Sequence, residues 1–393
     1  MEKPRRKVLI LGGGFAGIKA ALELVSDVDF DVTLISDQPN FRYYPTLFHA
    51  ATGGKMAASS IPLAEIFEGK PVKIIQDTAK TIDRPVQKVR CVSGKSFDYE
   101  TLIVALGVVT NFFGIKGLEQ YAYGIKTQEE AQRLRDHIHK QLVDDKKPDV
   151  NYVVIGGGPT GVELAGALPS YINHVMRQHK LKPARLHIDL VEAAPRLMGR
   201  MPASYSRAVQ KHLRKLGIKL YLGQTVQAET ANELMVSDHP IDSHTVIWTA
   251  GVTNHPFLKA NNFVLDNHGK AVVDEFLKSE HDIYVIGDNA STEYSGMAQT
   301  ALYDANFVAE NLKNQMADRE LKVYKPKRPI YVTPAGPNWA AVQWGNVHLY
   351  GWVGSVLRDA ADLRGFHDYE PWWKASELWV EENQEEKSCP ICS

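Results

Sequence analysis

Cysteine is scarce in this sequence, whose 393 residues include only Cys91, Cys389 and Cys392. Three cysteines cannot form a disulfide framework, and their scarcity suits a reducing compartment. Cys389 and Cys392 have the spacing of a metal-binding pair, but a structural zinc needs four ligands. We therefore expect no metal site, with a site shared between two subunits or a redox role left as alternatives for this pair.

Long hydrophobic runs and an excess of one charge are missing as well. No run of about 18 apolar residues occurs, so no membrane-spanning helix is expected. The formal net charge of -1 offers no basic face for nucleic acid. The basic residues at 3–7 lead straight into an apolar strand, so we expect no signal peptide and a cytoplasmic protein. The composition, 44% hydrophobic and 23% charged, is that of a globular protein with room for two or three domains.

What the sequence does have is a glycine-rich turn that occurs twice. An apolar run at 8–11 predicts a buried parallel strand and is followed by GGGFAG at 12–17; the run at 152–155 is followed by GGGPTG at 156–161. Both turns have the GxGxxG spacing. The first glycine permits a tight turn, the second lets backbone approach a pyrophosphate, and the third lets helix and strand pack closely. Two such cradles predict two bound dinucleotides.

The two cradles differ where the next strand of each unit ends. An acidic side chain there holds the adenosine ribose. The strand at 186–191 ends in Glu192, which favours NADH because a carboxylate repels the 2′-phosphate of NADPH. The strand at 31–35 is followed by Ser36, and the acid, Asp37, comes one place later. The ribose contact of the first cradle is therefore left open between two residues.

On these residues the chain resembles the two-dinucleotide-binding-domain flavoproteins, and within them the type II (alternative) NADH:quinone oxidoreductases. The resemblance implies an α/β fold with two Rossmann-like domains, the NADH domain being inserted into a discontinuous FAD domain, plus a short C-terminal segment. The motifs that carry it, besides the first turn, are the aromatic segment 40–53, GGGPTGVELAG at 156–166, WTAGV at 248–252, IGD at 286–288 and MAQTA at 297–301. The expected boundaries are 1–112 and 256–328 for the FAD-binding domain, 113–255 for the NAD(P)H-binding domain and 329–393 for the C-terminal segment.

The resemblance implies non-covalent FAD on the first cradle, with residues from far along the chain. Ala79 would meet the adenine through its backbone, and Asp288 would bind the ribityl chain. The implied FAD residues are Gly12, Gly13, Gly14, Phe15, Ala16, Gly17, Ser36, Asp37, Arg42, Ala79, Ala105, Gly107, Asp288, Ala298 and Gln299. The segment 40–53 lacks helical and strand periodicity, and we favour a packed loop over a wall of the flavin and acceptor site.

The resemblance also implies NADH on the second cradle, with Glu163 and Gln299 as catalytic residues. Glu163 would lie near nicotinamide and flavin; the alternative is a helix N-terminal acid stabilised by the helix dipole. Ala298 and Gln299 open a pattern that borders a quinone site, where Tyr303 replaces a second glutamine, so Gln299 and Tyr303 are the expected quinone contacts. The implied NADH residues are Gly156, Gly158, Pro159, Thr160, Gly161, Glu163, Glu192, Ala250 and Gly251.

The activity implied is that of a respiratory-chain enzyme: hydride passes from NADH to FAD and two electrons pass on to a membrane quinone, without proton pumping. Neighbouring classes that need cysteines beside the flavin are disfavoured, because none follows Gly17 in the first helix. Two alternatives stay open. One is a soluble flavoprotein that reduces oxygen, ferredoxin or another acceptor; the other is a redox-responsive binding protein with little turnover.

Six of the seven tryptophans lie after residue 330, where an apolar stripe has helical spacing. The stripe comprises Leu349, Trp352, Val353, Val356, Leu357, Ala360 and Leu363, with Arg358, Asp359, Asp362 and Arg364 on the other face. This pattern predicts peripheral attachment to the cytoplasmic face of the inner or plasma membrane. The alternative is a packed or dimer-forming segment, and a homodimer is expected. The acids Glu381, Glu382, Glu385 and Glu386 weigh against anionic lipid.

Overall fold

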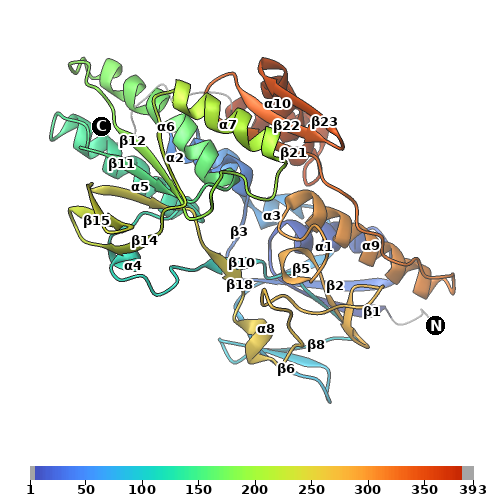
Figure 1. Cartoon of the computed structure of the whole chain (residues 1–393). Coiled ribbons are helices and arrows are strands. Elements are labelled where there is room, and N and C mark those ends of the chain that lie inside the picture. Colours follow the sequence, from blue (N-terminus) through green and yellow to red (C-terminus); the bar gives the residue numbers. More distant parts are fainter. Residues whose placement is uncertain (1–4, 383–393) are drawn as a thin grey trace.

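The computed structural model describes residues 5–382 and contains two parallel β-sheets with helices packed on them (Figure 1). Residues 1–4 and 383–393 lie outside this range, and with them the pair Cys389 and Cys392 and the acids Glu385 and Glu386. This is the α/β class that the family resemblance implied.

The first sheet joins segments far apart in the chain. Its strand order is β19-β20-β9-β1-β2-β5, and all neighbours are parallel except β19 and β20. In chain order the strands are β1 (Arg6–Leu11), β2 (Phe30–Ser36), β5 (Val72–Gln76), β9 (Thr101–Val104), β19 (Lys278–Glu280) and β20 (Ile283–Val285). Helices α1 (Phe15–Val25) and α9 (Ala298–Met316) pack side by side on this sheet (Figure 1). Residues 283–285 thus complete a sheet that residues 6–11 begin.

The second sheet repeats the same design with four parallel strands in the order β13-β12-β11-β17. The strands are β11 (Tyr152–Ile155), β12 (Ile188–Glu192), β13 (Lys219–Leu222) and β17 (Thr245–Trp248). Its helices are α5 (Gln128–Val143), α6 (Pro159–Gln178) and α7 (Ala203–Lys215). A three-stranded antiparallel sheet follows, made of β14 (Val226–Glu229), β15 (Glu233–Val236) and β16 (His239–Asp242). Burial of both faces explains the unbroken apolar runs that predicted these central strands.

Two strands connect the sheets. The chain leaves the first sheet through β10 (Val108–Thr110) and comes back through β18 (Val252–Asn254), and these two strands pair in antiparallel fashion. The short helix α4 (Leu118–Tyr121) follows β10, and the short helix α8 (Phe257–Ala260) follows β18. The outgoing and returning connections therefore lie against each other.

The segment 40–53, expected as a loop without regular structure, forms short elements instead. They are β3 (Asn40–Arg42), η1 (Tyr44–Thr46) and α2 (Leu47–Ala51). Strand β3 pairs with β4 (Ser60–Pro62), and α2 packs against α5 and α6. Each element is too short to show a period in sequence, because tertiary contacts rather than local propensity stabilise it. The remaining short elements of the first domain's region are η2 (Met56–Ser59), α3 (Leu63–Ile66), the antiparallel sheet of β6 (Ala79–Asp83), β7 (Lys88–Cys91) and β8 (Ser96–Asp98), and η3 (Gly287–Asn289).

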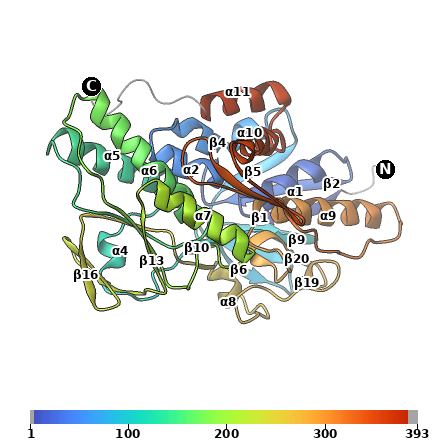
Figure 2. The ribbon, with the colours of Figure 1, turned by 45° about the horizontal axis from the view of Figure 1, so that its top comes forward.

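The C-terminal unit combines a sheet with two helices. It contains β21 (Tyr331–Pro334), β22 (Ala340–Trp344), β23 (Val347–Gly351), α10 (Trp352–His367) and α11 (Trp372–Glu382). Helix α10 packs on this sheet, and Figure 2 shows α11 lying beside α10. Leu349 lies in β23 opposite Val342, so its inclusion in a helical stripe was wrong. Gly351, at a φ of +85°, ends the strand and begins the helix at a conformation that favours glycine.

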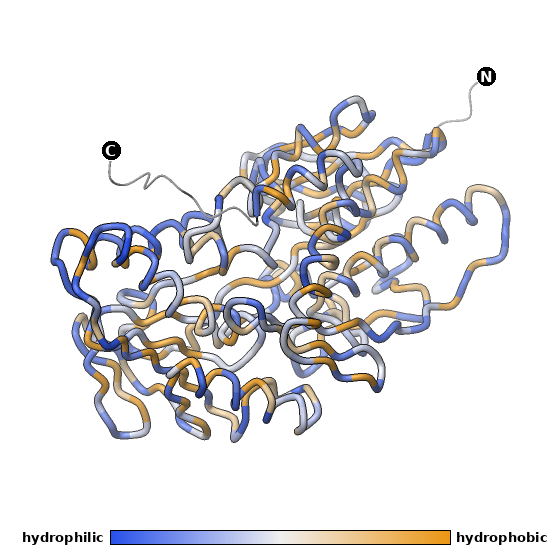
Figure 3. Tube along the Cα trace, turned by 90° about the horizontal axis from the view of Figure 1, so that it is seen from above, coloured by the Kyte–Doolittle hydropathy of each residue, from blue (hydrophilic) through white to orange (hydrophobic). Residues whose placement is uncertain are grey.

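Hydrophobic and hydrophilic residues alternate along the chain without a long apolar segment (Figure 3). Across residues 5–382, the helices lack the combination of length and hydropathy needed to cross a bilayer.

Candidate active site

The first glycine loop has the shape that a pyrophosphate cradle requires. Gly12 has a φ of +111°, and a Cβ there would lie 2.3 Å from the carbonyl oxygen of Ala105. A Cβ on Gly17 would lie 1.9 Å from the carbonyl oxygen of Gly12. Gly14, by contrast, has nothing within 4 Å of its Cβ position, so the space before it is open to a ligand. No side chain caps α1, which leaves its first N–H groups available to phosphate oxygens.

The second loop repeats this geometry almost unchanged. Gly156 has a φ of +114°, and a Cβ on Gly161 would lie 1.8 Å from the carbonyl oxygen of Gly156. Gly158 again faces open space, and α6 begins without a side-chain cap, with Pro159 as its first residue. A proline at this position gives up no helical hydrogen bond. Both loops therefore fit a nucleotide pyrophosphate.

The side chains that follow the paired strands distinguish the two loops. Glu192 ends β12, where its carboxylate accepts hydrogen bonds from the backbone N–H groups of Gly157 (2.5 Å) and Ala194 (2.7 Å). Ser36 ends β2 at the matching position, but its hydroxyl donates to the carbonyl of Gln38 and accepts from the Gln38 N–H. The strand registers agree, since Leu11 pairs with Ile35 and Ile155 with Val191. Glu192 and Ser36 are structural counterparts.

The acid beside Ser36 points elsewhere. Asp37 lies 3.8 Å from the Arg42 guanidinium, and its side chain is 61% exposed. The Ser36 hydroxyl is buried against Gly13, whose Cβ would lie 2.5 Å from it. The structure thus keeps Ser36 within the loop and leaves Asp37 and Arg42 as the polar groups at the surface of this cradle.

Residues from distant segments gather at the first loop. Asp288 lies in η3 after β20. Its pKa is raised by burial, while the positive charges of Lys126 and Lys270 oppose that rise. Ala298 begins α9, whose N-terminus has no side-chain cap. Ala16 is buried, with its side chain 3.2 Å from the Cβ position of Gly287. One carboxyl and one open helix end therefore lie near the first cradle.

The turn after β9 is held by Asn289, which lies next to Asp288 in η3. Gly107 has a φ of +70°; its N–H donates to the Asn289 side chain at 2.8 Å, and its carbonyl accepts from that side chain at 2.7 Å. Ala105 donates its N–H to the Leu11 carbonyl, and Ala79 begins β6 opposite Cys91. Asn289 was missed by sequence reasoning, although it directly follows the IGD motif.

Phe15 has a packing role. Its ring lies 5.0 Å from that of Phe41 and 5.6 Å from that of Tyr43, inside a cluster that Tyr369 of the C-terminal unit joins. Lys126 was another missed residue: its ammonium lies 5.3 Å from the Tyr44 ring centroid, and burial lowers its pKa. The only sequence signal for Lys126 is its place just before the capping box of α5.

The turn after β17 approaches the second loop. A Cβ on Gly156 would lie 2.8 Å from the Ala250 backbone, and one on Gly251 would lie 2.1 Å from the Asn111 carbonyl. Thr160 sits in the first turn of α6, beside the open space at Gly158. Gly251 therefore lies three residues beyond the end of β17, as Gly107 lies three beyond the end of β9. The counterpart of Ala105 is Thr249, because the N–H of each donates to the carbonyl of the last residue in the neighbouring strand.

Gln299 and Tyr303 lie on α9, where both make backbone contacts. The Gln299 amide donates to the carbonyl of Ile330 and accepts from its N–H, each at 3.0 Å. The Tyr303 hydroxyl donates to the Lys325 carbonyl at 3.1 Å, and its ring packs near that of Tyr324. In this structure the polar atoms of both side chains hold the segment at 325–330.

Glu163 is buried within α6 and faces a guanidinium from the C-terminal unit. It lies beyond the first turn of the helix, which weakens the alternative of a dipole-stabilised acid. The Arg358 guanidinium lies 3.7 Å from its carboxylate. Burial raises the pKa of Glu163 to about 8, and Arg358 opposes that rise. A carboxyl that titrates near neutral pH is suited to holding and releasing a proton.

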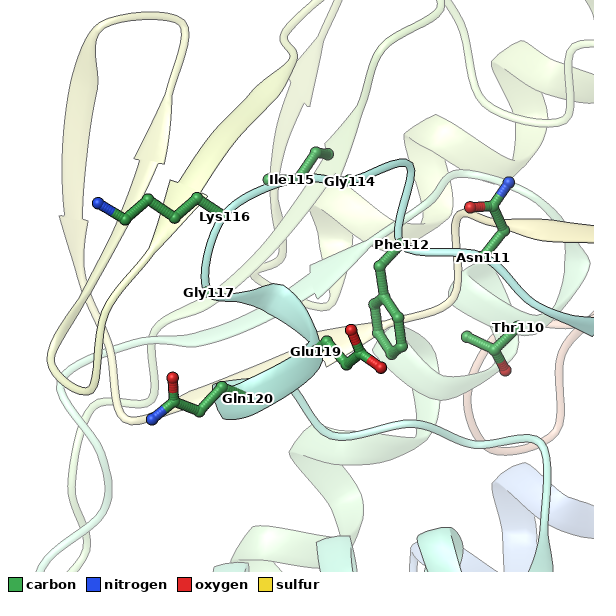
Figure 4. Close-up of a pocket in the computed structure, with 9 residues that line it drawn as sticks. All are labelled: Thr110, Asn111, Phe112, Gly114, Ile115, Lys116, Gly117, Glu119 and Gln120. Atoms are coloured by element: carbon green, nitrogen blue, oxygen red, sulfur yellow. The ribbon is translucent and has the colours of Figure 1, made fainter.

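A cavity of about 490 Å³ lies along the segment after β10 (Figure 4). Its walls come from the single stretch 110–120, and the side chains of Lys116 and Gln120 point outward in Figure 4. None of the predicted site residues lines it. One lining residue, Asn111, contacts Gly251 of the turn beside the second loop.

Comparison with known proteins identifies the family. Residues 6–305 match the pyridine nucleotide-disulphide oxidoreductase family. The chain is 30% identical over 349 residues to the type II NADH:quinone oxidoreductase of Mycobacterium tuberculosis, with 80% of this chain and 74% of the relative covered. The chain belongs to the type II NADH:quinone oxidoreductase family. A second member, from Staphylococcus saprophyticus, is 28% identical over 340 residues, which cover 80% of this chain and 83% of the relative.

Solved structures show the same fold. The NDH2 of Plasmodium falciparum, solved in complex with NADH, gives a TM-score of 0.84 at 17% identity, covering 96% of this chain and 97% of that one. The sulfide:quinone oxidoreductase of Aquifex aeolicus gives 0.80 at 21% identity, covering 97% and 94%. The family resemblance and the fold class predicted from the sequence are confirmed.

Proposed function

We propose that this type II NADH:quinone oxidoreductase oxidises NADH through FAD and reduces a quinone. The observation that carries the proposal is the pair of glycine loops and the strand that lies beside each. The strand beside the second loop ends in the carboxylate of Glu192, whereas the strand beside the first ends in the hydroxyl of Ser36. The relatives named above are NADH:quinone oxidoreductases, which supports the same chemistry.

In the proposal, residues 1–112 and 256–328 form the FAD domain and 113–255 the NADH domain, with 329–393 as a C-terminal segment. The first glycine loop, Asp288 and the N-terminus of α9 would hold FAD, which when bound would supply the chemistry of hydride and electron transfer. Ser36, Asp37, Arg42, Ala79, Ala105 and Gly107 complete this site.

The second glycine loop binds the NADH pyrophosphate, and Glu192 binds the adenosine ribose. Ala250 and Gly251 border this site. Glu163 lies five residues beyond Gly158 on the same helix and gives a proton to the acceptor, because its pKa near 8 keeps the carboxyl protonated at neutral pH. Reduction of a quinone by NADH takes up one proton beyond the hydride. Gln299 and Tyr303 form part of the quinone wall.

The C-terminal unit is proposed to attach the enzyme to the cytoplasmic face of a membrane. Its support is a set of exposed apolar side chains on both helices: Trp352, Val353 and Val356 at the start of α10, and Trp372 and Trp373 at the start of α11, with Trp352 and Trp373 each 70% exposed. We call this set the patch. A second copy of the chain is the competing occupant.

Acceptor assays test the proposed activity. Purified holoenzyme with NADH should reduce a short-chain quinone faster than it reduces oxygen or a ferredoxin. A faster reaction with oxygen or ferredoxin would support the soluble alternative, and negligible turnover despite bound FAD would support a sensor.

Substitution is a better test of membrane attachment than truncation, because α10 also supplies Arg358 to the buried site. The double change Trp352→Ser and Trp373→Ser should release the enzyme from sedimenting liposomes while FAD content stays unchanged. Val28→Ser is the matched control, since Val28 is 77% exposed on the loop after α1. Loss of a dimer with unchanged liposome binding would assign the patch to self-association.

A further inference from the structure

Helix α10 buries charge and exposes apolar side chains. Arg358 and Asp362 face the interior, each with a side chain 11–12% exposed, whereas Trp352, Val353 and Val356 are 70%, 48% and 45% exposed. Buried charged groups are costly unless they are paired. The charged face can therefore be buried only if Arg358 and Asp362 are paired inside the protein.

The Arg358 guanidinium lies much closer to Asp362 than to Glu163. Its Nε donates to the Asp362 carboxylate at 2.5 Å, and a terminal nitrogen donates to the Pro45 carbonyl at 2.9 Å. Its other terminal nitrogen lies 3.7 Å from Glu163, beyond hydrogen-bonding distance. Asp362 therefore holds the guanidinium, and Glu163 receives only its longer-range charge.

Charge balance in this cluster leaves Glu163 with a proton. Three buried carboxyl groups, those of Glu163, Asp362 and Glu382, surround one guanidinium, which stays charged at any relevant pH. One cation balances one carboxylate. Burial raises the pKa of Asp362 as well, but the charge of Arg358 and its hydrogen bond oppose that rise, so the hydrogen-bonded Asp362 is the ionised partner. Burial raises the pKa of Glu382 well above its ordinary range, and its Oε2 has no hydrogen-bond partner within residues 5–382.

The other titratable groups around the cluster leave this balance unchanged. Burial raises the pKa of Tyr43 and of Tyr205, so both are neutral. Asp359, one residue from Arg358, is half-buried, and burial raises its pKa as well. The charges that act on Glu163 are those of Arg358, which favours its ionised form, and Asp362, which opposes it.

We infer that Asp362 is a positioning residue for the proposed reaction: by holding Arg358 away from Glu163, it keeps the Glu163 carboxyl able to give a proton to the acceptor. The inference rests on the proposed function. In this step the O–H bond of Glu163 breaks as an O–H bond forms on the reduced quinone, and a proton from solvent restores the carboxyl. Asp362 and Arg358 lie on the helix with the exposed apolar face, so the element proposed to meet the membrane also controls the proton donor.

Two substitutions should move the pH profile in opposite directions. Asp362→Asn removes the competing carboxylate, so Arg358 stabilises ionised Glu163 and the pH midpoint of quinone reduction falls by about one unit or more. Arg358→Met removes the cation, and the midpoint rises. Arg358→Lys should restore most of the profile. The rate at which NADH reduces the bound flavin, measured by stopped flow, should stay unchanged in Asp362→Asn.

An infrared pH titration of the oxidised holoenzyme gives a readout independent of turnover. The carboxylic C=O band that Glu163→Gln removes should disappear at lower pH in Asp362→Asn than in the unmodified enzyme. Arg364→Gln is the matched control, since Arg364 pairs on the same helix with Asp368 and its side chain is 65% exposed. It should shift neither titration.

A Glu163 band whose midpoint is unchanged or raised in Asp362→Asn would overturn the inference. Should Arg358→Met fail to retain FAD, Asp362→Asn decides alone, because it preserves both shape and hydrogen bonding. An unmodified enzyme that reduces no quinone would refute the proposed function, and the infrared titration would still decide whether Asp362 controls Glu163.

Discussion

The two glycine-rich loops of this protein share a backbone and differ in their side chains. Gly12 and Gly156 have φ values of +111° and +114°, and both loops open onto space in front of their second motif glycine. Yet β12 ends in a carboxylate, and β2 ends in a hydroxyl that is engaged by its own turn. The shared backbone fits a pyrophosphate, and the side chains decide which nucleotide each loop favours.

The loops also differ in what distant segments bring to them. Near the first loop lie Asp288, Asn289 and the N-terminus of α9, all from beyond residue 280. On the helix that follows the second loop, Glu163 faces the guanidinium of Arg358 from the C-terminal unit. A site enclosed by many segments suits a retained cofactor, and one built mainly from a single unit suits a nucleotide that exchanges.

The strongest test of this difference between the two loops is to block each of them with a side chain. Gly14→Val and Gly158→Val place a side chain where the structure has nothing within 4 Å, at extended backbone angles that valine adopts easily. Gly14→Val should lower FAD content more than about 10-fold, because a blocked pyrophosphate loses several hydrogen bonds of about 1.5 kcal/mol or more each.

Gly158→Val should keep its FAD and raise the KM for NADH by a similar factor. Absorbance of bound flavin and steady-state kinetics distinguish the two outcomes, and each variant is the control for the other. Loss of FAD from Gly158→Val alone would reverse the assignment of the loops.

Glu192→Ser sharpens the comparison by giving the second loop the side chain of the first. The preference for NADH over NADPH, measured as the ratio of the two kcat/KM values, should fall about 10- to 100-fold. A charged hydrogen bond contributes about 1.5–3 kcal/mol. Glu192→Gln is the control for the contacts with Gly157 and Ala194. Unchanged selectivity in both variants would show that another residue contacts the ribose.

A smaller effect, on the pH dependence of stability, is expected from two buried carboxyl groups, one near the first loop and one in the antiparallel sheet of β14–β16. Asp304, near the first loop, accepts hydrogen bonds from Tyr324 (2.6 Å) and the Gly287 N–H (3.0 Å). Glu229, in β14, is 5% exposed, and its Oε2 lacks a hydrogen-bond partner among the described residues. Burial raises the pKa of Glu229 from 4.5 to about 8. Its contribution to stability is therefore present below pH 4.5 and lost as pH rises through 8.

Glu229→Met should raise the free energy of unfolding by about 1–3 kcal/mol at pH 8, and this advantage should shrink toward pH 5. Thermal denaturation at the two pH values measures the effect. A gain of the same size at both pH values would show that ionisation of Glu229 does not limit stability.

Sequence patterns predicted the repeated strand–glycine–helix unit because its signals are local. Gly12 and Gly156 need a conformation that glycine adopts freely, and apolar runs of four residues mark strands buried on both faces. Glu192 was found in the same way, since it directly follows such a run. The family resemblance also rested on these short, contiguous motifs.

Only the tertiary structure decided how distant segments meet. The short elements at 40–51 depend on β4, α5 and α6, and no local period marks them. The apolar stripe of α10 was visible in sequence, but the orientation of the helix was not. The helix exposes Trp352, Val353 and Val356 of that stripe, whereas Leu363 packs against the core. Arg358 and Asp362 pair inside, next to Glu163. A helical period in the sequence shows that a helix has two unlike faces. Which face is buried depends on the side chains that the neighbouring elements present to the helix.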